Sequence, residues 1–92
     1  MNAIPVLNDK KAFVAGFVQL VVWQVREPVP ASAHRFKYRL VYVVDGERVV
    51  GYDNERGKGD HKHIRGQEYP YLFRNIPGLL DDFWRDVVEA TR

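Results

Sequence analysis

The stretch FKYRLVYVVDGERVVGY, residues 36–52, decides the fold that the sequence predicts. Its first half alternates large apolar residues with Lys37 and Arg39, which is the period of two expected of a half-buried strand. Asp45 and Gly46 follow, and the next residues resume the extended pattern. Glycine accepts the positive φ of a type I′ turn, so this stretch predicts a β-hairpin.

A two-residue loop sets the register of the hairpin by counting outward from the turn. Val44 then faces Glu47, and Tyr42 faces Val49. A one-residue bulge would move the side chains of the second strand to the other face. Without a bulge, one face of the hairpin gathers Lys37, Arg39, Val41, Val43, Arg48, Val50, Tyr52 and Asn54.

The other strands have weaker signals. The nearly continuous apolar run at residues 17–25 predicts a strand that is central or buried on both faces, ended by two prolines. Two short strands are predicted at residues 61–64 and 69–73, with a turn between them. Because proline lacks a backbone donor, Pro70 places the second strand on an edge or limits its pairing.

The C-terminal segment predicts a helix. Asn75 and Pro77 fit a helix start, and apolar residues then recur at helical spacing. The predicted fold is therefore α+β, with an antiparallel meander packed by this helix. We expect one domain over residues 1–92, with a loosely ordered segment at 1–12 (a short strand at 4–7), the sheet at 13–73 and the helix at 76–91.

The composition narrows the class of protein. Hydrophobic residues make up 46% of the 92 residues and aromatic residues 13%, which is too apolar for a disordered tail. The absence of cysteine excludes a disulfide scaffold, a thiol nucleophile and a zinc site with cysteine ligands. The apolar run after Lys10 and Lys11 has the outline of a secretory signal, but two glutamines interrupt it and cleavage would leave too small a core. It is also shorter than the roughly 20 residues of a membrane span, so we expect no membrane partner.

The densest polar motif is YDNERGKGDHKH, residues 52–63. On an extended chain, His61 and His63 point to one face and Lys62 to the other. Two imidazoles on one face can bind a metal, act as an acid/base pair, or form hydrogen bonds to the backbone. A zinc ion would need a third ligand, with Asp53, Asp60 and His34 as the candidates.

Acid/base chemistry needs neither a metal nor a cofactor. A histidine suits proton transfer at neutral pH, and Lys58, Arg56 or Arg65 could stabilise the charge that develops when an RNA 2′-hydroxyl attacks its own phosphate. The predicted catalytic residues are His61, His63, Asp53 and Lys58. If a metal is present instead, its predicted ligands are His61, His63 and Asp53.

The hairpin itself is a second candidate site. Residues 32–65 carry eight basic and five acidic side chains, whereas the predicted helix is acidic. Basic side chains with an aromatic between them suit phosphate contacts and base stacking, although a solvated outer face would have the same pattern. The predicted RNA- or phosphate-binding residues are Lys37, Arg39, Arg48, Tyr52, Asn54, Arg56, Lys62 and Arg65.

These segments together resemble the TumE family of toxin–antitoxin toxins from about residue 13 onward. The resemblance lies in FVQLVVW (17–23), HRFKYRLVY (34–42), Val44-Asp45-Gly46, YDNERGKGDHKH and the closing LLDDFWRDV. It implies a small cytoplasmic bacterial protein encoded beside a helix-turn-helix antitoxin. The motif positions that carry over are Tyr52, Asp53, Asn54, Lys58, Gly59, Asp60, His61 and His63.

The leading hypothesis is a toxin that acts on RNA or the translation machinery by metal-independent, histidine-assisted RNA cleavage. The alternatives are a non-catalytic RNA- or protein-binding module that uses the basic hairpin face, and a metal-dependent nuclease. The expected partners are the antitoxin and RNA, no cofactor is expected, and a homodimer is left open.

Overall fold

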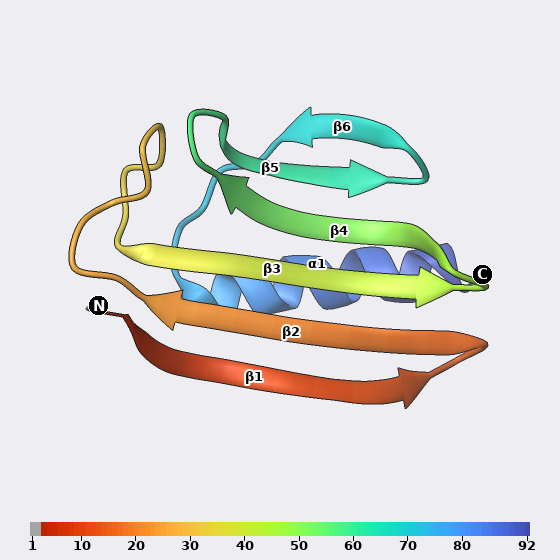
Figure 1. Cartoon of the computed structure of the whole chain (residues 1–92). Coiled ribbons are helices and arrows are strands. Elements are labelled where there is room, and N and C mark those ends of the chain that lie inside the picture. The colour runs from red at the N-terminus through yellow and green to blue at the C-terminus, as the bar shows by residue number, and fades with distance from the viewer. Residues whose placement is uncertain (1–2) are drawn as a thin grey trace.

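The computed structural model describes residues 3–92, which form one antiparallel sheet with a helix across one face (Figure 1). Within these residues the six strands lie in the sheet in the same order as in the chain. This arrangement confirms the predicted α+β meander packed by a C-terminal helix. The elements are β1 (Ile4–Phe13), β2 (Gly16–Gln24), β3 (Phe36–Val44), β4 (Glu47–Glu55), β5 (Gly59–Ile64), β6 (Gln67–Pro70) and α1 (Ile76–Ala90).

The predicted hairpin is β3–β4, and its turn has the predicted type I′ form. Asp45 and Gly46 both have positive φ, at 52° and 78°. The turn pairs Val44 with Glu47 as predicted, but the register then shifts, and Tyr42 pairs with Val50 instead of Val49. The prediction without a bulge is therefore wrong beyond the first pairs, because one extra residue in β4 moves the rest of that strand to the opposite face.

The N-terminal segment differs most from its prediction. Where a loosely ordered segment at residues 1–12 and a strand at 4–7 were predicted, β1 pairs along nearly the whole length of β2. Most of its side chains are exposed because it is an edge strand, and the helix meets it near its C-terminal end, where Phe13 packs edge to face against Trp84. β1 therefore lacks the apolar alternation of a half-buried strand. Residues 1 and 2 lie outside the described residues.

Three other strand predictions are corrected. β2 is an interior strand, but only alternate residues are fully buried (Val18 and Val22 are 0% exposed), so it is buried on one face and not on two. β5 begins two residues earlier than predicted, at Gly59. β6 covers residues 67–70 instead of 69–73, because the turn before it falls at Arg65 and Gly66, which both have positive φ. β6 is an outer strand of the sheet, as Pro70 predicted.

The helix packs an apolar stripe onto one face of the sheet. Leu79, Phe83 and Val87 are fully buried against the alternate apolar residues of β2, β3 and β4. The helix starts where predicted, and the Asn75 side chain caps it by accepting a hydrogen bond from the Gly78 amide at 2.7 Å. Within residues 3–92 no helix has both the length and the apolar character needed to cross a membrane.

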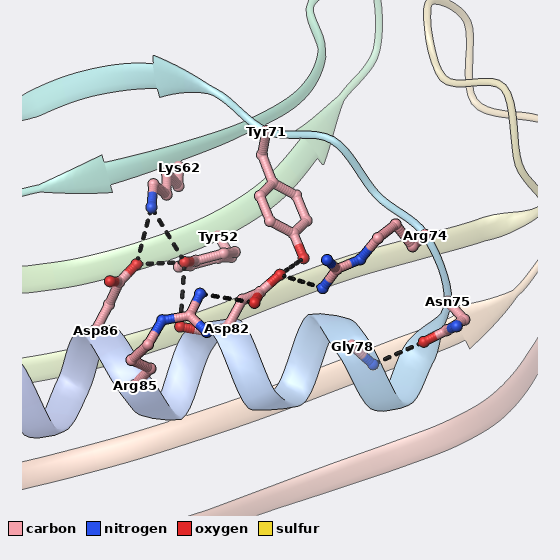
Figure 2. A network of polar contacts seen from close by, with 9 residues as sticks. All are labelled: Tyr52, Lys62, Tyr71, Arg74, Asn75, Gly78, Asp82, Arg85 and Asp86. Carbon is pink, nitrogen blue, oxygen red and sulfur yellow. Dashed lines mark hydrogen bonds and ion pairs between the residues drawn. The ribbon is translucent and has the colours of Figure 1, made fainter.

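A network of hydrogen bonds and ion pairs links the helix to the sheet and to the segment before the helix (Figure 2). The Asp82 carboxylate accepts hydrogen bonds from the Tyr71 hydroxyl at 2.6 Å, from Arg74 at 2.9 Å and from Arg85 at 2.7 Å. Burial opposes ionisation of this carboxyl, but the hydrogen bonds and the two guanidinium charges hold the pKa of Asp82 below its usual value. Asp82 thus joins α1 to the segment that leads into it.

Candidate functional site

The sheet has one face that α1 does not cover, here called the open face (Figure 1). Because directly paired residues share a face of a sheet, the register shows which side chains lie there. Arg39, Asp53 and His61 are paired across β3, β4 and β5, and the next row pairs Gly51 with His63. The open face therefore brings together Asp53, His61 and His63, which we call the Asp–His cluster.

The side chains of the cluster are in direct contact. His61 Nε2 lies 2.7 Å from Asp53 Oδ1, and the two histidine rings meet edge to face with centroids 5.0 Å apart. One ligand-type atom from each of the three residues lies within 4.8 Å of the others. The prediction that the two imidazoles lie together, with Asp53 beside them, agrees with this arrangement.

His61 is the buried member, with 3% of its surface exposed. Its Nδ1 lies 3.1 Å from the Gly59 carbonyl oxygen. A carbonyl can only accept, so Nδ1 carries a proton and donates. Although Nε2 and Asp53 Oδ1 are at ion-pair distance, neither of these buried atoms has a hydrogen-bond partner among residues 3–92.

His63 is the more accessible histidine. Partial burial, the positive charge of Arg48 and the neighbouring His61 lower the pKa of His63, which favours the neutral ring. The Arg48 side chain reaches it by lying across Gly51: a Cβ built on Gly51 would be 2.6 Å from Arg48 Cδ. The absence of a side chain at residue 51 thus lets the guanidinium group approach His63.

Lys58, predicted to hold phosphate, makes a different contact. Its Nζ lies 3.8 Å from a carboxylate oxygen of Glu68, and both side chains are exposed. Glu68 is paired with His63 across β5 and β6, so it is a neighbour of both Lys58 and His63. Arg56 is exposed in the turn between β4 and β5. Neither basic residue contacts an imidazole in this structure.

Of the predicted hairpin surface, Lys37, Arg39 and Arg48 lie on the open face, but Tyr52 does not. The bulge turns Tyr52 toward the helix, where it is fully buried and bonded through its hydroxyl to Asp86 (Figure 2). Grouping Tyr52 with these basic residues is therefore wrong. Lys37 itself donates a hydrogen bond to the Asn54 carbonyl oxygen at 2.8 Å, whereas Arg39 is exposed.

Three further residues predicted to bind RNA have structural partners. The buried Asn54 side chain bonds to the backbone of β3 at the Tyr38 amide (2.9 Å) and the Phe36 carbonyl (2.6 Å). Lys62 lies on the helix side, 3.1 Å from Asp86 Oδ2 (Figure 2). Arg65 donates to the Ala90 carbonyl at 2.8 Å, near the C-terminal end of α1, where a cation is favourable.

The other candidate metal ligands lie away from the cluster. His34 Nε2 is 2.7 Å from Asp60 Oδ2, and the Tyr38 and Ser32 hydroxyls donate to the same carboxylate at 2.7 Å and 2.6 Å. Asp60 alternates with His61 along β5 and therefore faces the helix side. Of the three proposed third ligands, only Asp53 is brought to the two histidines.

Sequence reasoning missed Gly51 and Glu68. A glycine inside a strand often marks a close approach, and this signal was present at residue 51. Glu68 had no such signal, because its position beside His63 depends on where the turn between β5 and β6 falls.

The fold and the cluster define a class: a small α+β protein with two histidines and an aspartate beside arginines on an uncovered sheet face. Residues 6–91 match the family model described as "Toxin TumE", so the chain belongs to this toxin family. The match confirms the resemblance seen in the sequence and extends it into β1. No curated protein and no solved structure matches the chain. Membership of a toxin family of this kind implies an antitoxin partner.

Proposed function

We propose that the protein is the toxin of a bacterial toxin–antitoxin system and that it acts on RNA at the open face. The observation that supports this most directly is the Asp–His cluster lying beside Arg39 and Arg48 on a face that no helix covers. Arginines suit the phosphate backbone, and the family match supports the toxin role.

The reaction that fits these residues is metal-independent cleavage by the RNA's own 2′-hydroxyl. His63 takes the proton of that hydroxyl, whose oxygen bonds to the adjacent phosphorus. The bond from phosphorus to the 5′-oxygen breaks, and the leaving oxygen takes a proton from water. The products are a 2′,3′-cyclic phosphate and a 5′-hydroxyl end.

The other residues of the open face stabilise charge or position His63 during this cleavage step. Arg48 stabilises the negative charge that develops on the phosphate oxygens, and Arg39 holds a neighbouring phosphate. His61 is too buried to reach RNA, so we assign it, with Asp53, to positioning the ring of His63. A well-placed proton acceptor of this kind contributes about 10²–10⁴-fold to the rate.

Two elements of the proposal rest on the family resemblance alone. These are the cytoplasmic location of the toxin and the helix-turn-helix character of its antitoxin. Co-purification of the toxin with the product of a neighbouring gene tests this partner.

Induced expression in a bacterial host tests the reaction. His63→Gln should restore growth and remove the new cyclic-phosphate ends from cellular RNA. His34→Gln is the matched control, because His34 lies outside the cluster, and it should remain toxic if its circular dichroism spectrum is unchanged. Full toxicity of folded His63→Gln would reject the catalytic role.

The burial of His61 favours one alternative, a non-catalytic module that binds RNA or protein through the basic residues. In that case Arg39→Glu would abolish toxicity while His63→Gln would not, and no cyclic-phosphate ends would form. The same growth assay therefore separates the two functions.

A further inference from the structure

We infer that Asp53, His61 and His63 form a binding site for a divalent cation of the zinc class. Asp53 and His61 are direct partners across β4 and β5, and His63 lies two residues along β5 on the same face. Rigid, paired strands therefore bring the three ligand-type atoms within 4.8 Å of one another. Two imidazoles and a carboxylate are ligands that zinc accepts in proteins.

The contact between His61 and Asp53 is the main argument. With its proton on Nδ1, facing the Gly59 carbonyl, a neutral His61 ring presents the lone pair of Nε2. That lone pair faces the carboxylate oxygen at 2.7 Å, and two acceptors at this distance repel unless a positive group lies between them. A second ring proton or a metal cation would meet this need.

Three observations fit a cation at this position. Neither facing atom has a hydrogen-bond partner within the described residues, and both atoms are buried, where an unpaired polar atom is costly. A histidine that binds a metal usually donates its other N–H to a backbone carbonyl or carboxylate, and His61 does so to Gly59. His63 provides a third ligand at the accessible side, where a water or a phosphate oxygen could complete the coordination.

The fit requires a small adjustment. At bond lengths of about 2.0–2.1 Å, two ligands at a tetrahedral angle lie roughly 3.3 Å apart, so the facing atoms of Asp53 and His61, now 2.7 Å apart, must separate by about 0.6 Å. Any pair of ligand atoms near the 4.8 Å limit must instead approach one another. The Arg48 charge opposes the cation, whereas the Asp53 carboxylate and the nearby Glu68 favour it.

Zinc binding does not depend on the proposed function, but the effect that we expect zinc to have on RNA cleavage rests on that function. A coordinated His63 has no lone pair with which to accept the proton of a 2′-hydroxyl. Zinc should therefore suppress RNA cleavage at this site, which would make the cluster a point of regulation.

The binding test uses the full chain, stripped with EDTA, desalted and titrated with Zn²⁺ by calorimetry. We expect one zinc per chain, with affinity reduced by at least about tenfold in Asp53→Asn, His61→Gln and His63→Gln. The controls His34→Gln and Asp81→Asn replace a histidine and an exposed carboxylate outside the cluster and should bind as the parent does. If His61→Gln fails to fold, the partly exposed His63 gives the decisive variant. No binding by the parent, or unchanged binding by folded His63→Gln, would overturn the inference.

An RNA cleavage assay on the same samples separates this inference from the proposed function. Inhibition of the parent by Zn²⁺, relieved by EDTA, supports both. Activity that EDTA abolishes and Zn²⁺ restores would overturn the metal-independent mechanism and leave the metal site standing. An active protein that binds no zinc would overturn the metal site alone.

Discussion

Replacing Gly51 by alanine tests whether Arg48 supports RNA cleavage from its position beside His63. The added Cβ would lie 2.6 Å from Arg48 Cδ and 3.1 Å from Nε, whereas carbon atoms in contact are about 3.5–4.0 Å apart. The Arg48 side chain must therefore move by about 1 Å. The atoms that clash belong to an exposed, flexible side chain and not to the backbone, so the arginine can move without unfolding the strand.

Stability and activity should respond in opposite ways. Glycine inside a strand is about 0.5–1 kcal/mol less favourable than alanine, so the free energy of unfolding should stay level or rise slightly. Activity should fall, because a misplacement of about 1 Å at a reacting centre can cost about 100-fold. Urea denaturation measures the first quantity, and the rate of RNA cleavage measures the second.

The control is a double-mutant cycle with Arg48→Ala. Once the arginine side chain is removed, Gly51→Ala has nothing left to displace and should cause no further loss of activity. Independent, multiplicative losses from the two substitutions would refute the reasoning. So would a fall of more than about 2 kcal/mol in stability for Gly51→Ala, since such a loss indicates a core or backbone defect.

Two further predictions concern stability. Phe83→Ala removes a fully buried ring between α1 and the sheet and should lower the free energy of unfolding by about 3–5 kcal/mol. An unchanged midpoint in urea denaturation would show that the helix is not packed as described. The pKa of Asp82 is lower in the folded protein than in the unfolded chain, so its ionised carboxylate stabilises the fold at pH values above the usual carboxyl pKa of about 3.9. This stabilisation is lost as the pH falls through the pKa that Asp82 has in the folded protein. Thermal unfolding between neutral pH and pH 2 should show a smaller acid-induced loss for Asp82→Asn than for the parent, and equal losses would contradict the assignment.

Much of the fold follows from local patterns. The Asp45-Gly46 turn, the alternation before it and the apolar spacing after Asn75 each depend on neighbours in the chain, and each appears in the structure as predicted. β1 could not be predicted in the same way. Its mostly exposed side chains leave no periodic signal, and it is held by backbone pairing with β2 and by the packing of Leu7 and Phe13 against the core.

Only part of the candidate site could likewise be predicted from local patterns in the sequence. Alternation along an extended chain is enough to place His61 and His63 on one face, so the sequence by itself determined the pair. The sequence also proposed Asp53 as their acidic partner, but it left Asp60 as a further candidate, and only the tertiary structure decided between the two. The bulge in β4 exchanges the faces of Tyr52 and Asp53, and a single extra residue of this kind arises from packing and pairing that no local pattern records. Strand register thus brought Asp53 to the histidines and left Asp60 with His34 on the other side of the sheet.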